Sequence, residues 1–346
     1  MSDAGDPAPG RARIGVFGMF LRLFIIAAFL VGAAALGGAY YAQQQYMAAG
    51  PSTADGEARN VVVPAGASVR RMADTLAEAG AIEDPFRFRL AARVLDVETD
   101  LKAGEYAVPS GASLKEILEI LREGKAVLYP ITIPEGLTSA MIMRRLEASE
   151  VLTGDLPEVT PAEGVLLPDT YLVPRGETRE AMVSRMIRAK QEVVEELWAS
   201  RQPGLPIDTP EDAVILASIV EKETGMAEER PRVAAVFVNR LRRPMRLESD
   251  PTIIYGISQG EPLGRGLRRS EIDRKTPYNT YQIDGLPPTP ICNPGRDAIA
   301  AVLDPPQTND LFFVADGTGG HAFATTYAEH RRNVANWRKI EAARRQ

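Results

Sequence analysis

The sequence predicts an α+β protein with three parts: a single N-terminal transmembrane helix, a small βααβ module and a larger mixed α/β domain. Three observations support this division. A charge-free apolar run comes early in the chain, a strand–turn–helix pattern recurs after it, and a long apolar helix marks the second half. With 346 residues and 45% hydrophobic content, the chain is long enough to bury real cores.

The apolar run covers residues 23–41 and contains no charged side chain. As a helix it is long enough for a hydrocarbon core, which takes about 20 residues. Three arginines lie in residues 1–22, and the first charge after the run is Asp55. By the positive-inside rule, residues 1–22 form a cytoplasmic tail, and the rest lies on the periplasmic side of the plasma membrane. A cleaved signal peptide is the alternative, because small residues follow the run, although its apolar region would be shorter.

Residues 42–59 are small and polar and are predicted to be a linker. The module at 60–129 is recognised by a repeated pattern: a β-branched strand, a Pro-x-Gly turn, a Ser or Thr cap and an amphipathic helix. The pattern starts at Val61, Ala107 and Thr132. With a further helix inserted between them, the first two units resemble a LysM-like domain, a βααβ fold that sits on glycan chains. The alternative is a spacer that holds the rest of the chain off the membrane.

The larger domain, residues 130–346, is organised around one predicted helix between Thr209 and Gly225. Thr209 is suited to cap its first turn, and Gly225 to end it in a left-handed conformation. The apolar run inside the helix is too continuous for a surface position, so we expect the helix to be buried. Two carboxylates, Glu221 and Glu223, arrive in its final turn, where burial is costly.

The two carboxylates differ in their neighbours on the helix surface. The residues three, four and seven positions before Glu223 are large and apolar, whereas those before Glu221 are smaller. Bulky apolar neighbours push a carboxyl toward its protonated form, which a general acid needs at neutral pH. From the residue types alone, a structural ion pair explains these carboxylates better than a catalytic acid does, because ion pairs also place carboxylates in such surroundings. The available cations are Lys222, Arg230 and Arg232.

Composition argues against several other classes of function. The net charge of −6 lacks the basic surplus of a nucleic-acid-binding protein. The single cysteine, Cys292, has no partner for an intramolecular disulfide and no ligand motif around it. The two histidines, His321 and His330, stand nine residues apart, and no Cys/His/Asp cluster shows ligand spacing. We therefore expect neither a metal nor another cofactor.

Three segments after the central helix are dense in Tyr, Asn, Gly and Pro and are predicted to be loops that carry binding residues. They begin at Asp250, Lys275 and Leu311. Aromatic rings beside amides and hydroxyls suit a sugar, because they offer apolar faces together with hydrogen bonds. The candidates for positioning a sugar are Tyr278, Asn279, Tyr281 and His321.

These motifs together resemble the endolytic murein transglycosylase family, the YceG-like proteins. The resemblance rests on ASIVEKETG, MRLESDPTIIYG, TPYNTY, GLPPTPICNPG and FVADGTGGHAFATTYAEH, and it extends over nearly the whole chain. It implies a membrane-bound lyase that cuts inside nascent peptidoglycan strands, between N-acetylmuramic acid and N-acetylglucosamine. The product would carry a 1,6-anhydromuramic end, and cutting would limit strand elongation.

The resemblance also assigns the catalytic acid, because the second Glu of the family's E-K-E-T motif falls on Glu223. Glu221 and the four sugar-positioning candidates are then expected at the substrate site. Peptidoglycan synthases, the penicillin-binding proteins, are the expected neighbours of such an enzyme. One alternative is a hydrolase that uses water and needs a second acid, for which the candidates are Glu221, Asp250 and Asp284. The other is a non-catalytic, glycan-binding anchor.

Overall fold

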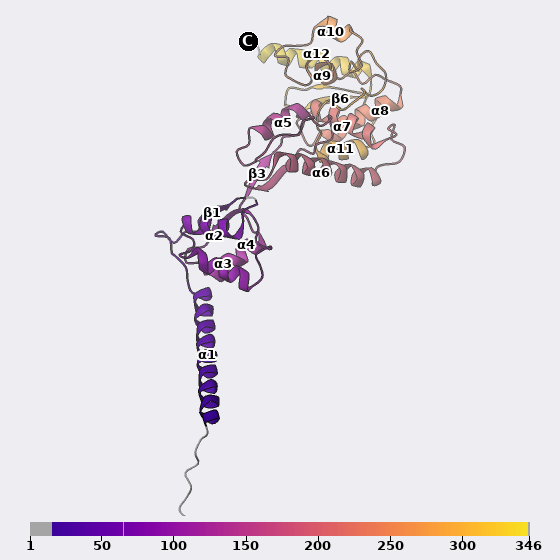
Figure 1. The fold of residues 1–346 in the computed structure, drawn as a ribbon. Coiled ribbons are helices and arrows are strands. Elements are labelled where there is room, and N and C mark those ends of the chain that lie inside the picture. Colours follow the sequence, from indigo (N-terminus) through magenta and orange to yellow (C-terminus); the bar gives the residue numbers. More distant parts are fainter. Residues whose placement is uncertain (1–15, 65, 345–346) are drawn as a thin grey trace, which may run out of the picture. The chain divides into compact units, whose positions relative to one another are not determined.

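The computed structural model describes residues 16–64 and 66–344, so most of the predicted cytoplasmic tail lies outside the described residues. The chain divides into two compact units between Val127 and Leu128. Both units combine helices with short antiparallel strand pairs (Figure 1). The predicted α+β class is therefore confirmed.

Helix α1 (Val16–Met47) is longer than the predicted transmembrane run at both ends. From Met19 to Met47 it is long and apolar enough to cross a membrane. Its large apolar side chains in this stretch, such as Phe24 and Phe29, are exposed. A signal sequence near an N-terminus meets the same criteria of length and hydropathy.

The rest of the first unit is a small layer of helices beside one strand pair. Strands β1 and β2 are antiparallel, with Val61 opposite Tyr106. Both side chains are buried with Leu76, Phe88 and Leu121 in one core. The elements in chain order are β1 (Arg59–Val63), α2 (Val69–Glu78), α3 (Pro85–Val94), β2 (Gly104–Val108) and α4 (Leu114–Glu123).

The repeated strand–turn–helix pattern is present in all three predicted places. Ser68 caps α2, Ser113 caps α4 in a capping box with Glu116, and Thr138 caps α5. Each cap side chain accepts an N–H that the first helical turn leaves without a partner. The third repeat opens the second unit, whose first elements are β3 (Leu128–Thr132), α5 (Ser139–Glu147), β4 (Thr170–Pro174) and α6 (Arg179–Ala199), with β3 antiparallel to β4.

Helix α7 (Pro210–Glu223) is the predicted central helix, and its position confirms that prediction. Every residue from Ala213 to Val220 is buried. The helix packs against α6 and against α8 (Arg230–Arg242) and α11 (Arg296–Leu303), which surround it in Figure 1. A carboxylate at its end is therefore held by a rigid element.

The predicted start of α7 is confirmed, and the predicted end is not. Thr209 caps the start, as predicted, and it also forms a capping box with Asp212. The prediction that Gly225 ends the helix in a left-handed turn is wrong. The helix ends at Glu223, and the C-cap residue Thr224 is extended with φ −139° and ψ 132°. The buried Thr224 hydroxyl accepts the N–H of Met226 at 3.1 Å, so a side chain replaces the glycine turn.

Two segments predicted as loops are regular. The segment from Asp250 is helix α9 (Asp250–Ser258), because Asp and Pro in the first turn suit a helix start. The segment from Leu311 contains an antiparallel hairpin. The segment between Lys275 and Gly295 forms turns without helix or strand, as predicted. The remaining elements are α10 (Arg269–Asp273), β5 (Phe312–Ala315), β6 (His321–Ala324) and α12 (Tyr327–Arg344).

Candidate active site

Glu223 is the last residue of α7, and its carboxyl group meets the start of α9. Ser249 Oγ donates a hydrogen bond to Glu223 Oε1 at 2.5 Å. Burial among protein atoms raises the pKa of Glu223 to about 7. The Ser249 hydrogen bond and the charges of His321 and Arg240 oppose this rise, and the Asp250 carboxylate adds to it. Near neutral pH this carboxyl group can therefore give up a proton and take one back.

Ser249 stands at the N-cap position of α9, yet its side chain does not cap that helix. An N-cap serine ordinarily accepts an N–H from the first turn. Here the hydroxyl donates to Glu223 instead. Donation to Oε1 leaves Oε2 as the oxygen that can carry the acidic proton. Ser249 therefore fixes the orientation of the carboxyl group.

Two buried threonines hold Ser249 in this position. The Ser249 N–H donates to Thr280 Oγ1 at 3.0 Å, and Thr252 Oγ1 donates to the Ser249 carbonyl at 2.7 Å. The two threonine hydroxyls also lie 2.8 Å apart, and all three side chains are buried. Ser249 thus has its backbone fixed from two sides before its hydroxyl reaches Glu223.

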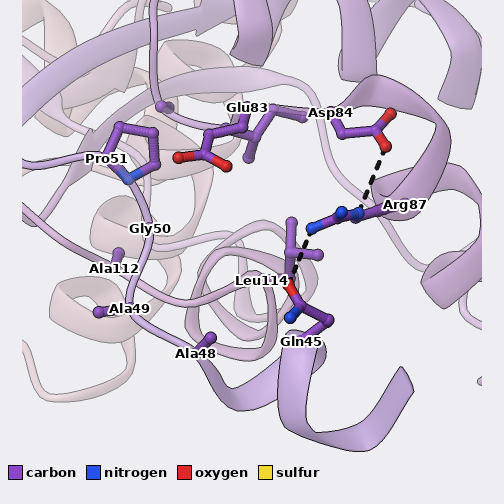
Figure 2. A pocket seen from close by; sticks show the side chains of 12 residues that line it. Gln45, Ala48, Ala49, Gly50, Pro51, Glu83, Asp84, Arg87, Ala112 and Leu114 are labelled. Carbon is purple, nitrogen blue, oxygen red and sulfur yellow. Dashed lines mark hydrogen bonds and ion pairs between the residues drawn. The ribbon is translucent and has the colours of Figure 1, made fainter. Parts of the chain in front are cut away.

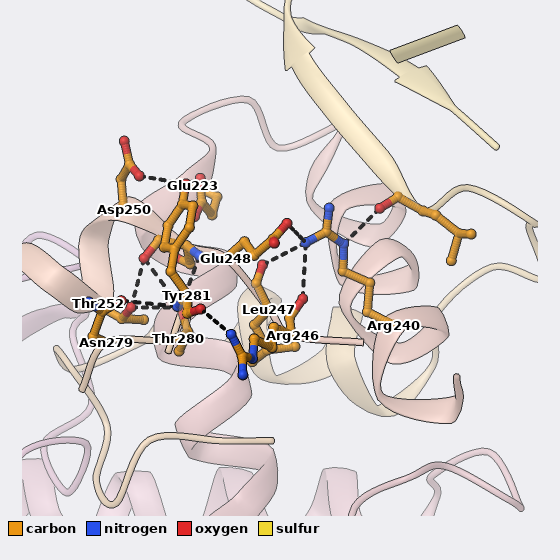
Figure 3. Close-up of polar contacts among 12 residues, drawn as sticks. Glu223, Arg240, Arg246, Leu247, Glu248, Asp250, Thr252, Asn279, Thr280 and Tyr281 are labelled. Atoms are coloured by element: carbon orange, nitrogen blue, oxygen red, sulfur yellow. Dashed lines mark hydrogen bonds and ion pairs between the residues drawn. The ribbon is translucent and has the colours of Figure 1, made fainter. Parts of the chain in front are cut away.

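Tyr281 and Asp250 form the polar edge of the same site (Figure 3). Tyr281 Oη donates to Asp250 Oδ1 at 2.8 Å. Burial raises the pKa of Tyr281 above its usual range, and the Asp250 carboxylate raises it further. The tyrosine therefore stays neutral and remains a hydrogen-bond donor. Of the sugar-positioning candidates, Tyr281 lies within this network around Glu223.

Arg240 anchors the segment that leads into α9. Its guanidinium donates to the Leu311 carbonyl at 2.7 Å and to the Leu247 carbonyl at 3.0 Å. It also contacts the Glu248 carboxylate at 3.1 Å. Glu248 has a φ of 51°, a conformation that costs energy in a residue other than glycine. Arg240 thus holds a strained turn immediately before Ser249.

His321, at the start of β6, is held by a carboxylate from the turn before α8. Glu229 Oε1 accepts the His321 backbone N–H at 2.8 Å, and Glu229 Oε2 lies 2.7 Å from His321 Nδ1. Gly320 is needed beside this pair, because a Cβ there would meet Glu229 Oε1 at 2.5 Å. With Nδ1 bound to the carboxylate, Nε2 is the ring nitrogen that remains for another partner.

Glu221 occupies different surroundings from Glu223. Its side chain is 5% exposed, and Oε1 lies 3.4 Å from Arg230. Oε2 accepts the Gly295 N–H at 2.9 Å. Arg230 also contacts the half-exposed Glu135 at 3.2 Å, so the three side chains form a small ion network. This is the structural ion pair that the sequence left open as an alternative, and here it applies to Glu221.

Of the other two candidates, Asn279 adjoins the network around Glu223, because its Oδ1 accepts the Tyr281 N–H at 3.0 Å, whereas Tyr278 lines a different part of the second unit. Asn279 is buried, and its amide donates to three carbonyls of the preceding segment, which shapes the loop. Tyr278 packs edge-on against Tyr255, with ring centroids 5.0 Å apart, and its hydroxyl meets Thr289. Both rings line an open groove of about 830 Å³ beside the first half of α7, and Glu223 is not among its lining residues.

Sequence reasoning missed Ser249, Thr252 and Thr280 as parts of the site. A serine before Asp-Pro is the ordinary signal of a helix cap, so nothing in the local pattern indicates a contact with Glu223. Thr280 lies inside the TPYNTY motif, in which the aromatic and amide residues were the predicted sugar-positioning candidates. In the described residues, no group of three His, Cys, Asp or Glu side chains is arranged to hold a metal ion.

Comparison with known proteins places the chain in a family. Residues 61–336 match the YceG-like family. A protein named endolytic murein transglycosylase from Streptococcus pneumoniae (strain D39) is 30% identical over 366 residues, which covers 91% of this chain and 65% of that protein. The protein of the same name from Bacillus subtilis (strain 168) is 36% identical over 172 residues, or 49% of this chain and 46% of that protein.

This chain therefore spans less than two thirds of the length of these relatives. A crystal structure of a yceG-like protein from Listeria monocytogenes covers 79% of this chain and 98% of its own, at 27% identity and a TM-score of 0.49. The family match covers both units from residue 61 to residue 336 and leaves out α1, the segment 48–60 and the last residues. This chain belongs to the YceG-like family.

Proposed function

We propose that this protein is a membrane-anchored endolytic lytic transglycosylase that cleaves the glycosidic bond between N-acetylmuramic acid and N-acetylglucosamine in peptidoglycan strands. The observation that carries the proposal is Glu223, a carboxyl group with a pKa of about 7 that Ser249 holds on a buried helix. The similarity to proteins named endolytic murein transglycosylase supports the same reaction.

In the proposed reaction, one carboxyl group does the work of acid and base in turn. Protonated Glu223 gives its proton to the glycosidic oxygen as the bond to the muramic C1 breaks, and positive charge develops at C1. The resulting carboxylate then takes the proton of the muramic C6 hydroxyl, whose oxygen bonds to C1. The 1,6-anhydro ring closes, Glu223 regains its proton, and no water is consumed.

A hydrolase of the same polymer is the second candidate, and it would require another carboxylate near the bond. Glu221 is engaged by Arg230 and the Gly295 N–H. Asp284 has an 88% exposed side chain that pairs with Arg246. Asp250 accepts from Tyr281 beside Glu223, which leaves it as the carboxylate that such a mechanism would use. Because Glu221 and Asp284 are already held by other partners, the structure favours the single-acid mechanism.

Product analysis separates the two reactions. Purified glycan strands are digested in H₂¹⁸O, and the new ends are identified by mass spectrometry. We expect 1,6-anhydromuramic ends without ¹⁸O. Reducing ends that carry ¹⁸O would show that the enzyme is a hydrolase. Binding of strands with no cleavage under any condition would favour the non-catalytic anchor.

The pH dependence of cleavage is expected to shift in opposite directions in two neighbouring variants. The acid must be protonated at the outset, so the rate falls as pH rises through the pKa of Glu223, about 7. Ser249→Ala removes a donor that favours the carboxylate, so the alkaline limb should move to higher pH. Asp250→Asn removes a negative charge, so the limb should move to lower pH.

The pH–rate profiles of kcat/KM for the wild type and both variants check this expectation. Tyr281→Phe is the matched control for Asp250→Asn, because it removes the Tyr281–Asp250 hydrogen bond and keeps the Asp250 charge. Shifts of both variants in the same direction would contradict the assigned roles, even if both rates fell.

We infer that α1 stays in the plasma membrane as a single-pass anchor with the second unit on the outer side. The length and apolar surface of α1 and the arginines before it support this. The β1–α2–α3–β2 order supports a LysM-like fold for the module. We propose that the module contacts glycan and that peptidoglycan synthases are partners of the protein. A reporter enzyme that works only in the cytoplasm, fused after Gln346, should therefore be inactive. Activity of this fusion would contradict the topology.

A further inference from the structure

The apolar surface of α3 is turned away from the core of the first unit. Phe88 and Ala92 on its inner face are fully buried. Phe86, Leu90 and Val94 recur every fourth residue, which places them on one outer face of the helix. They are 60%, 46% and 74% exposed, respectively. A row of large apolar side chains in water at this spacing calls for an apolar partner.

The C-terminal turns of α1 lie beside the row formed by Phe86, Leu90 and Val94. An apolar crevice of about 520 Å³ lies between the last turns of α1 and α3. Tyr41 and Tyr46 line it from α1, and Leu90 and Val94 line it from α3. Tyr46 also packs on the core of the module. The exposed row on α3 therefore continues the exposed apolar surface of α1.

Polar contacts fix α1 to the module at this junction. Arg87 donates to Gln45 Oε1 at 2.8 Å and lies 3.4 Å from the Asp84 carboxylate, so it bridges α1 and α3, as Figure 2 shows. The next turn is held as well, because the Gly50 N–H donates to the Gly111 carbonyl at 3.1 Å. A Cβ on Gly50 would meet Ala112 O at 2.4 Å. The segment predicted as a linker thus begins with an ordered connection.

The position of the crevice along α1 indicates what covers the row. The charge-free residues 23–41 span about 28 Å as a helix, close to the thickness of a hydrocarbon core. Tyr41 and Tyr46 then fall at the outer boundary, where tyrosine rings are favoured. The α3 residues that line the same crevice lie at that depth too.

Basic side chains stand on the other flank of the row. Arg70, Arg89 and Arg93 line a second hollow beside Phe86 and Leu90, in which Glu98 is the single acidic side chain. In the part of the chain that the structure describes, these arginines form no ion pair with an acidic side chain. Apolar residues on one face with arginines beside them are typical of a helix that lies in a membrane interface, where phosphate groups meet the cations.

We propose that α3 lies on the outer leaflet of the membrane that α1 crosses, with Phe86, Leu90 and Val94 among the acyl chains and Arg89 and Arg93 at the phospholipid phosphates. The crevice between α1 and α3 takes an acyl chain of a neighbouring lipid. This inference rests on α1 remaining in the membrane, and it is independent of the reaction at Glu223.

The test uses the full-length protein in phosphatidylglycerol nanodiscs, with a nitroxide on single introduced cysteines. Native Cys292 is buried, and its pKa is raised above the usual range, so it is kept. The reporting variants are Leu90→Cys and Val94→Cys. Glu119→Cys on α4, with a side chain 54% exposed, is the aqueous control, and Ala33→Cys within α1 is the lipid control. Collision rates with oxygen and with a nickel chelate give the depth of each label.

We expect the labels at 90 and 94 to collide with oxygen in preference to the nickel chelate, as the label at 33 does, and the label at 119 to show the reverse. Arg89→Glu together with Arg93→Glu should move the label at 94 several-fold toward nickel accessibility. Arg71→Glu on α2, with a side chain 58% exposed, should not.

Three outcomes would overturn the proposal. Aqueous labels at 90 and 94 with a lipid-like label at 33 would exclude the docked face and leave the anchor intact. Aqueous labels at all positions would exclude both. Labels at 90 and 94 that neither reagent reaches would show that protein, rather than lipid, covers the row.

Discussion

Glu223→Gln is expected to lower the rate of strand cleavage by at least about 10²–10⁴-fold, the range that general acid–base catalysis contributes. The amide keeps the size of the side chain and can still accept from Ser249, but it has no proton to transfer. Because one carboxyl group serves both steps of the proposed reaction, no other group replaces it. Single-turnover release of anhydromuramic ends from purified strands measures the effect.

Glu221→Gln is the matched control, since it makes the same change two residues away on the same helix. Its effect on the rate should be much milder, because Glu221 contacts Arg230 and the Gly295 N–H instead of the Ser249 network. If Glu223→Gln keeps near-full activity and Glu221→Gln is inactive, the acid has been assigned to the wrong carboxylate.

The stability of Glu223→Gln should not fall with its activity. Burial raises the folded-state pKa of Glu223 to about 7, above its value in the unfolded chain. Between those two values the folded protein holds a proton that the unfolded chain has released. The carboxyl group therefore lowers stability as pH rises through this window. Above about pH 7 the variant should be at least as stable as the wild type in urea unfolding, and below about pH 4 the two should agree.

Arg240→Met is expected to lower the free energy of unfolding of the second unit by about 2–6 kcal/mol. It leaves the buried carbonyls of Leu311 and Leu247 without their donor, at about 1–3 kcal/mol each. The strained turn at Glu248 also loses its anchor, so Ser249 should drift from Glu223 and the rate of cleavage should fall.

Arg242→Met, two residues further along α8, provides the comparison. Arg242 is exposed and makes one long contact, 3.3 Å to the Gly204 carbonyl. Its loss should change stability by no more than about 0.5 kcal/mol. Urea unfolding of both variants measures the difference, and equal effects would show that Arg240 does not anchor the turn.

Features set by neighbouring residues were predictable from the sequence. The caps at Ser68, Ser113 and Thr138 and the capping box at Thr209 depend on contacts within one helical turn, so the pattern of residues determines them. The burial of α7 follows from its apolar run. The rise in the pKa of Glu223 was expected from the large side chains on its own helix face.

Contacts between distant segments were not predictable in this way. The Ser249–Glu223 hydrogen bond joins residues 26 positions apart, and Ser249 N–H meets Thr280 a further 31 positions on. A serine hydroxyl can cap its own helix or bond to another segment. Which of the two occurs depends on the segments packed beside it, and the residues next to the serine in sequence do not reveal them. The end of α7 shows the same limit, because the buried Thr224 hydroxyl replaced the expected glycine turn.

The division of the chain between Val127 and Leu128 has a consequence for where cutting takes place. The network around the acid belongs to the second unit, and no described residue of the first unit takes part in it. Its members are Glu223, Ser249, Asp250, Tyr281 and Arg240. Proteolysis at the junction would release a fragment that carries this whole network. For the proposed membrane-anchored transglycosylase, attachment would leave the chemistry at Glu223 unchanged. It would confine the enzyme to a thin layer at the membrane and raise its effective concentration toward strands that emerge nearby. Peptidoglycan farther from the membrane would then lie beyond the reach of the enzyme.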